Sequence, residues 1–81
     1  MYWIYILQSQ KNDRYYIGSS NDIERRLAEH NRGKSPYTAS TRPWKLVFSK
    51  EFATLKAARQ FEHSLKKQKS RKVIEELLAG G

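Results

Sequence analysis

The chain of 81 residues contains no cysteine, and this absence excludes several kinds of site. Disulfide bridges, thiolate nucleophiles and cysteine zinc sites all need a residue that the sequence lacks. Only two histidines and eight Asp and Glu residues are present, so a zinc site built from several histidines is not expected either. Two Trp, five Tyr and three Phe are available to supply much of the hydrophobic core instead.

Long hydrophobic runs are also absent. The opening Tyr2–Leu7 is apolar but too short to span a membrane, and it lacks the basic leader and small-residue cleavage site of a signal peptide. We therefore predict a soluble, cytoplasmic protein. Because 81 residues suffice for one small core, we expect residues 1–81 to form a single domain.

Acidic residues are scarce relative to basic ones. Sixteen Lys and Arg against eight Asp and Glu give a net charge of +8, and from Lys56 to Lys72 the one acid is Glu62. Such a segment attracts a phosphate backbone whatever its sequence, although a solvated basic helix would have the same composition. An anionic membrane is not expected, because no Trp/Phe/Leu insertion face accompanies the charge. We predict a nucleic-acid partner, with DNA the expected one, bound by Lys66, Lys67, Lys69, Arg71 and Lys72.

The hydrophobic pattern predicts an α+β protein, in which a small three-stranded antiparallel sheet packs against three helices in the order β-β-α-β-α-α. Apolar, aromatic-rich runs too short for helices place the strands at Tyr2–Gln8, Tyr15–Ser19 and Trp44–Phe52. The expected N-caps of the three helices are Asn21, Thr54 and Ser70, and Asn31-Arg32-Gly33 is the stop of the first helix.

Two tyrosines stand out in the predicted hairpin. If the chain turns around Gln10 and Lys11, Tyr5 lies directly across from Tyr16, and both hydroxyls emerge on one face of the sheet. A positioned phenol can relay or remove a proton. Tyrosine is also a common strand residue without any chemical role.

Glu62 is the most anomalous residue of the second predicted helix. It falls inside an apolar stripe that runs from Leu55 to Leu65, about 20° from Leu55 on a helical wheel. A carboxylate facing a core needs a partner, because an unpaired buried charge is costly. The partner is either a hard cation such as Mg²⁺ or Mn²⁺, or Lys66, four residues on in the favourable orientation.

Two polar residues of the first predicted helix lie on or near its buried side. Arg26 is placed where its guanidinium fork can meet phosphate oxygens, although a snorkelling surface arginine would occupy the same position. His30 follows four residues later on the same side, where a histidine often interacts with the helix dipole. Arg25 points toward solvent, and His63 is assigned no role.

These residues together resemble the GIY-YIG nuclease family. The resemblance covers about residues 2–67 and rests on Trp3-Ile4-Tyr5, Tyr16-Ile17-Gly18, Arg26, His30 and Glu62 in this order. Trp3 stands where the first half of the family motif has Gly. The excision-repair subunits of the family have a Lys at the position of Ser19, and the Asn that some family restriction enzymes use after the glutamate is absent here.

The resemblance implies a metal-dependent endonuclease that acts on DNA, in repair or recombination. It implies that water attacks with help from Tyr5 or Tyr16, that Arg26 stabilises the phosphate, that His30 positions the nucleophile or a tyrosine, and that Glu62 holds one Mg²⁺ or Mn²⁺. We expect Gly18 to keep a strand position bare for a close approach.

Two other interpretations stay open. One is a nucleic-acid-binding module that cleaves poorly or not at all, which the missing Lys and Asn favour. The other is a structural domain whose tyrosines belong to the core and whose basic helix docks an acidic partner.

Overall fold

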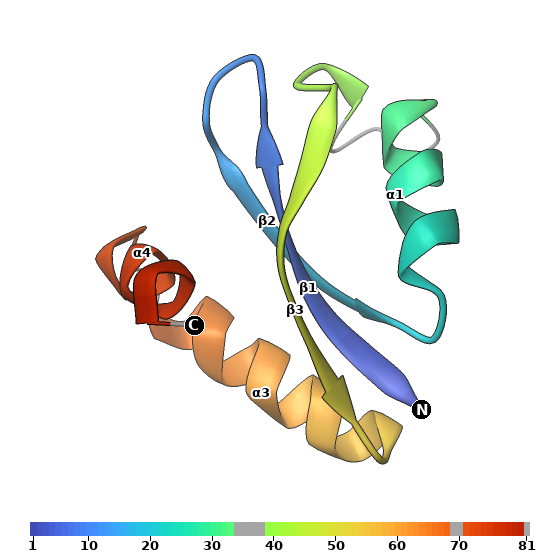
Figure 1. Ribbon diagram of the computed structural model, residues 1–81, viewed down its shortest axis with the longest axis vertical. Coiled ribbons are helices and arrows are strands. Elements are labelled where there is room, and N and C mark those ends of the chain that lie inside the picture. The colour runs from blue at the N-terminus through green and yellow to red at the C-terminus, as the bar shows by residue number, and fades with distance from the viewer. Residues whose placement is uncertain (34–38, 69–70, 81) are drawn as a thin grey trace.

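The sheet lies between helices on both of its faces (Figure 1). The structure is a computed structural model, and it describes residues 1–33, 39–68 and 71–80. The strand order is β2-β1-β3 with both pairings antiparallel, so β1 is the central strand. The predicted α+β class and element order are confirmed: β1 (Tyr2–Ser9), β2 (Tyr15–Ser20), α1 (Ile23–Asn31), β3 (Trp44–Phe52), α3 (Leu55–Gln68) and α4 (Arg71–Gly80).

The two faces of β1 belong to different parts of the core, because successive strand residues point to opposite faces. Ile4 and Ile6 are fully buried in an aliphatic cluster with residues of α3 and α4. Tyr5 and Leu7 point the other way and pack with Trp44 and with apolar residues of α1. The alternation therefore puts Tyr5 on the α1 side of the sheet.

The register of the β1–β2 hairpin differs from the prediction. Tyr5 pairs with Gly18, and Tyr16 pairs with Leu7, so the two tyrosines are not directly opposite. The pairing is displaced by two residues, which preserves the face that each side chain occupies. The prediction of direct pairing was wrong, and the prediction of a shared face is right: the two tyrosine rings lie 6.4 Å apart between centroids.

Ser9 explains the displaced register. Its backbone N–H donates to Arg14 O, which makes the loop longer than a two-residue turn. Its buried hydroxyl accepts from the backbone N–H groups of Lys11 and Asn12, at 3.1 and 3.3 Å, and donates to Thr41 O. A serine at the end of a strand thus organises the turn by side-chain-to-backbone hydrogen bonds.

α1 begins one residue later than predicted. Its N-cap is Asp22, whose Oδ1 accepts from Arg25 N at 3.1 Å, and Asn21 precedes the cap. Ser20 selects this start, because its hydroxyl accepts from Asp22 N at 3.0 Å and holds the connection from β2. An aspartate also suits the positive end of the helix dipole.

The end of α1 is held against β3. Asn31 Oδ1 accepts from Trp44 N at 2.6 Å, and Asn31 Nδ2 donates to Trp44 O at 3.1 Å. Gly33 follows with a φ of +78°, a left-handed conformation that suits glycine after a helix. The predicted stop at this point is confirmed, and the two bonds of Asn31 fix the distance of α1 from the sheet.

The second predicted N-cap is confirmed, because Thr54 Oγ1 accepts from Ala57 N at 3.1 Å at the start of α3. The third, Ser70, lies outside the described residues, as does Lys69. α4 is tied to the hairpin by Arg71, which donates to Asp13 O at 3.0 Å and lies over the Tyr15 ring at 4.9 Å.

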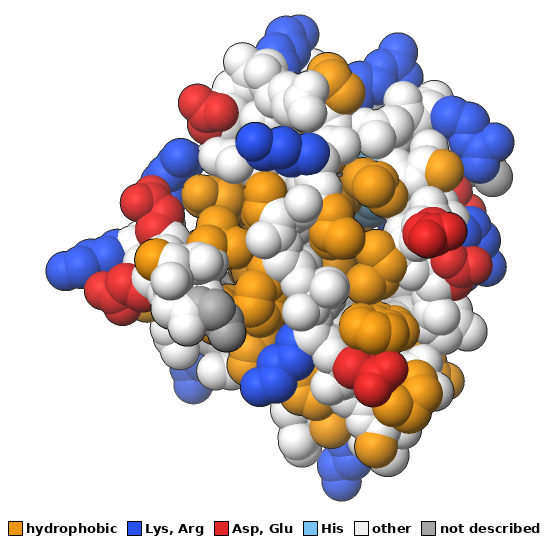
Figure 2. Space-filling view, viewed as in Figure 1, with side chains coloured by type: hydrophobic (Ala, Val, Ile, Leu, Met, Phe, Trp, Pro, Cys, Tyr) orange, Lys and Arg blue, Asp and Glu red, His pale blue; other side chains and the backbone are white. Residues whose placement is uncertain are grey.

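The surface combines scattered basic side chains with apolar ones. On the face shown in Figure 2, hydrophobic side chains gather over the sheet, and Lys and Arg stand mostly around the margins. Within the described ranges, no helix is both long and apolar enough to cross a membrane.

Candidate active site

Four of the predicted site residues meet between the sheet and α1. The hydroxyl of Tyr5 interacts with the Arg26 guanidinium, and it lies 3.5 Å from His30 Nε2. The Tyr16 ring packs edge-on against the His30 ring, with 4.7 Å between centroids. Two strands and one helix therefore bring phenol, imidazole and guanidinium groups into one cluster.

Gly18 makes room for this cluster. A β-carbon at Gly18 would stand 2.5 Å from Tyr5 Oη and 2.6 Å from Tyr5 Cζ, closer than such atoms approach. The Tyr5 side chain therefore lies across its bare strand partner. The prediction that Gly18 permits a close approach is confirmed, and the approaching group is the phenol of Tyr5.

Arg26 is at the edge of the site. Its side chain is 35% exposed, and Nη1 forms a 2.6 Å salt bridge with Glu29 Oε1. The hydrogen bond to Tyr5, followed by that to Glu29, raises the pKa of Arg26 above its ordinary value. Glu29 was missed by the sequence analysis, although its i,i+3 spacing from Arg26 is a recognised pairing signal. Arg25 is exposed, as predicted.

The cluster favours neutral forms of its buried groups. Burial raises the pKa of Tyr5, and the charges of Tyr16 and Glu62 add to the rise, while the hydrogen bond and charge of Arg26 oppose it. Burial also lowers the pKa of His30, with a further contribution from the positive charge of Arg26 and an opposing one from Glu29. At neutral pH the site therefore presents a protonated phenol beside a neutral imidazole.

Glu62 belongs to α3, which lies on the other side of the sheet from α1 (Figure 1). Its side chain is 19% exposed, and its carboxylate forms a 2.7 Å salt bridge with Lys66, the partner that the spacing also predicted. Its negative charge reaches Tyr5, because it contributes to the raised pKa of that phenol. Glu62 also lines a shallow surface hollow with Arg59, His63 and Lys66.

The donor set around Glu62 is compatible with Mg²⁺ or Mn²⁺ only in an open site. In the described part of the chain, no group of three or more His, Cys, Asp or Glu side chains could hold a metal ion. Mg²⁺ is commonly bound by one or two carboxylates together with water and substrate phosphate. A single half-buried carboxylate on an accessible hollow fits that mode of binding, with Lys66 as its present partner.

The predicted nucleic-acid-binding residues have different environments. Lys66, Lys67 and Lys72 are exposed on α3 and α4. Arg71 is also exposed, but its guanidinium is engaged with the hairpin and with Glu75 at 2.8 Å. Of the members of this set that the structure describes, Lys66, Lys67 and Lys72 are thus accessible to a partner.

Comparison with known proteins identifies the family. Residues 1–75 match the GIY-YIG catalytic domain. The chain belongs to the GIY-YIG family. The two half-motifs of the name correspond to β1 and β2, which carry Tyr5 and Tyr16 into the cluster. This GIY-YIG chain is therefore a nuclease-type catalytic domain by fold and family.

The relatives of this GIY-YIG domain include both small proteins and parts of larger ones. A UPF0213 protein from Streptococcus pneumoniae is 40% identical over 68 residues, which cover 83% of this chain and 68% of the relative. The structure-specific endonuclease subunit SLX1 of Meyerozyma guilliermondii is 41% identical over 76 residues, but the match covers 26% of that protein and 85% of this chain. The solution NMR structure of a UPF0213 protein from Bacillus halodurans is similar, with a TM-score of 0.62, 31% identity and coverage of 98% of this chain and 84% of that one.

Proposed function

We propose that this GIY-YIG domain is a divalent-metal-dependent endonuclease that hydrolyses phosphodiester bonds of DNA, with a role in DNA repair or recombination. The observation that carries the proposal is the cluster in which Tyr5 joins Arg26 and His30. A guanidinium beside a phenol and a neutral imidazole supplies a charge for a phosphate and a path for a proton. The related SLX1 proteins support a nucleic-acid substrate.

In this mechanism, water attacks the phosphorus as the P–O bond to the leaving oxygen of the DNA strand breaks. A tyrosine hydroxyl takes a proton from the attacking water and passes its own proton to an acceptor, and the leaving oxygen is protonated by solvent water. Tyr5 has the neutral imidazole of His30 at 3.5 Å as an acceptor, and Tyr16 is the more exposed of the two phenols. Arg26 moves from Glu29 toward a phosphate oxygen and stabilises the negative charge that develops there.

Glu62 is the residue proposed to hold Mg²⁺ or Mn²⁺. The bound cation would supply Lewis-acid stabilisation of the phosphate charge. To accept it, the carboxylate gives up its salt bridge with Lys66, and Lys66 is then available to a phosphate. Sequence-independent attraction for the DNA backbone, which weakens as salt increases, would come from Lys67, Lys69, Arg71 and Lys72.

Cleavage with and without Mg²⁺ tests the proposal, on duplex, single-stranded and branched DNA. Glu62→Gln preserves volume, so the fold is expected to survive while cleavage and Mg²⁺-induced thermal stabilisation are lost. Lys66→Met is the matched control and should retain Mg²⁺-dependent stabilisation. If the two variants are equally impaired and Mg²⁺ does not change the melting temperature of the wild type, Glu62 is only a salt-bridge residue.

A nucleic-acid-binding module without cleavage is the second candidate. The Glu62–Lys66 salt bridge favours it, because this pair neutralises the carboxylate without any cation. Salt-sensitive DNA binding, combined with no cleavage by the wild type in any metal, would select this alternative.

A further inference from the structure

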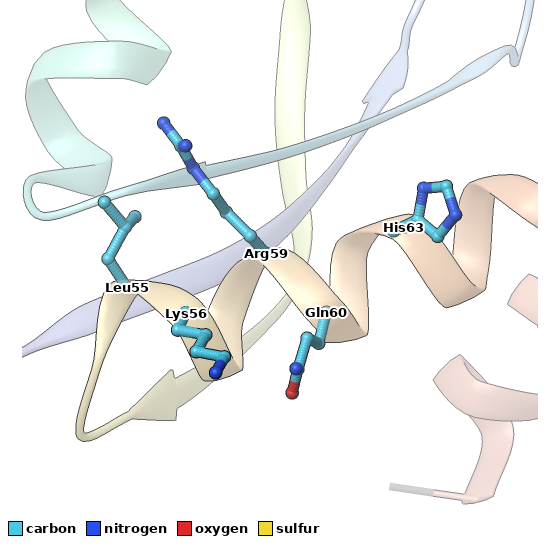
Figure 3. Close-up of a pocket in the computed structure, with 5 residues that line it drawn as sticks. All are labelled: Leu55, Lys56, Arg59, Gln60 and His63. Carbon is cyan, nitrogen blue, oxygen red and sulfur yellow. The ribbon is translucent and has the colours of Figure 1, made fainter.

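A shallow hollow runs along the exposed side of α3, separate from the tyrosine cluster. Its volume is about 510 Å³, and its lining residues form the two rows shown in Figure 3. One row contains Leu55, Arg59 and His63, and the other contains Lys56 and Gln60. Because residues four apart on a helix lie one above the other, the two rows run side by side along the surface of α3, and the shallow hollow between them is the α3 groove.

The groove continues to Glu62. Arg59 and His63 also line the neighbouring hollow of about 370 Å³, together with Glu62 and Lys66. The two hollows therefore share part of their lining along one side of α3. A ligand in the groove would lie next to the carboxylate that the proposed function assigns to a cation.

The lining combines flat, apolar and cationic groups. The guanidinium of Arg59 and the imidazole of His63 are planes on which unpaired bases stack. The amide of Gln60 offers both a donor and an acceptor to a base edge. Lys56 provides a cation for a phosphate, and Leu55 gives apolar contact. A duplex presents phosphates outward and keeps its base faces stacked inside. It would therefore contact the positive charges of the lining but could not stack on the planar groups of Arg59 and His63.

We propose that the α3 groove binds an unpaired strand of nucleic acid adjacent to the cleavage site. Exposed Lys56 and Arg59 make the groove complementary to a polyanion. The helix rises about 12 Å from Leu55 to His63, so the groove is long enough for a short run of nucleotides. The position next to the scissile bond rests on the proposed function, but binding itself needs neither metal nor cleavage.

Fluorescence anisotropy tests the proposal, with a labelled single-stranded oligothymidine and a blunt duplex of equal length, both in EDTA. Arg59→Lys keeps the charge and removes the plane, and His63→Ala removes the other plane. Each variant should weaken single-strand binding by about tenfold and change duplex binding by less than about twofold. Lys56→Gln should reduce the salt slope for the single strand by about 0.7.

Arg25→Lys is the matched control, because it makes the same exchange at an exposed arginine of α1 and should leave both affinities unchanged. Equal losses for single strand and duplex, or unchanged single-strand binding in Arg59→Lys and His63→Ala, would overturn the proposal. If the wild type cleaves DNA but the groove variants bind the single strand normally, the groove proposal is wrong and the proposed nuclease function stands. If Arg59→Lys and His63→Ala selectively lose single-strand binding while the wild type cleaves no DNA, the groove proposal is supported and the nuclease function is rejected.

Discussion

Tyr5 Oη occupies the space beside Gly18 where a β-carbon would stand. Gly18→Ala should therefore push the Tyr5 ring out of the cluster, because the 2.5 Å approach cannot be kept. We expect the free energy of unfolding to fall by about 1–3 kcal/mol, with a larger loss of cleavage than of DNA binding. Urea denaturation and single-turnover cleavage measure the two effects. Ser19→Ala, one position along the same strand, is the control, and equal behaviour of the two variants would contradict the packing argument.

His30 should make stability depend on pH. Its pKa is lowered in the folded protein, mainly by burial, so the unfolded chain binds its proton more readily. This stabilisation is complete above the unfolded pKa of about 6.5 and is lost as pH falls through the lower folded value. The wild type should consequently lose stability between about pH 7.5 and 5.5.

A titration-free variant isolates this effect. The urea concentration at the midpoint of unfolding should fall less between about pH 7.5 and 5.5 in His30→Gln than in the wild type. His63→Gln, at an exposed position on α3, should keep the wild-type dependence. The explanation would be wrong if His63→Gln, and not His30→Gln, reduced the dependence.

Among the elements, α4 owes its position partly to Arg71. This side chain contacts the carbonyl of Asp13, the ring of Tyr15 and the carboxylate of Glu75. Arg71→Ala should lower the free energy of unfolding by about 1 kcal/mol, since one cation–π contact and one hydrogen bond are lost. The neighbouring exposed Lys72→Ala should change it by less than about 0.5 kcal/mol. Equal urea midpoints for the two variants would mean that Arg71 does not hold α4 on the hairpin.

Element types and order follow from local patterns. Short apolar runs and a helical stripe identify three strands and three helices, and β3, the end of α1 and the Thr54 cap occur where expected. Hairpin register could not be predicted in the same way, because it depends on the buried hydroxyl of Ser9 and its contact with Thr41, 32 residues away. The shift of the α1 cap to Asp22 likewise depends on hydrogen bonds with Ser20.

The candidate site is predictable to a similar extent. Residue types and order point to Tyr5, Tyr16, Arg26 and His30, which the fold brings together. Their mutual contacts are long-range and appear only in three dimensions: the hydroxyl of Tyr5 and the ring of His30 are 25 residues apart in sequence. The spacing of Glu62 suggested both a cation and Lys66 as partners, and the observed salt bridge leaves the cation a proposal.

For the molecule as a whole, a small catalytic domain with a charge of +8 can attract DNA through many exposed side chains. Binding alone is therefore weak evidence for the proposed nuclease, because a basic fold of this kind would bind without cleaving. An effect on the cleavage rate has to be separated from an effect on DNA affinity. Removing one positive charge inside the tyrosine cluster and, for comparison, one outside it makes this separation. Arg26 and Arg25 are adjacent in sequence, but Arg26 interacts with Tyr5 and forms a salt bridge with Glu29, whereas Arg25 is exposed.

The most direct measurement is single-turnover DNA cleavage at saturating Mg²⁺ by Arg26→Ala and Arg25→Ala, with Tyr5→Phe and Tyr16→Phe beside them. Arg26→Ala should lower the rate by about 10²–10³, because a charge partner of the transition state is lost, while Arg25→Ala stays near the wild type. At least one Phe variant should lose about 10²–10⁴ in rate, with DNA affinity nearly unchanged in all four. Wild-type rates in Arg26→Ala and in both Phe variants would contradict the active-site assignment.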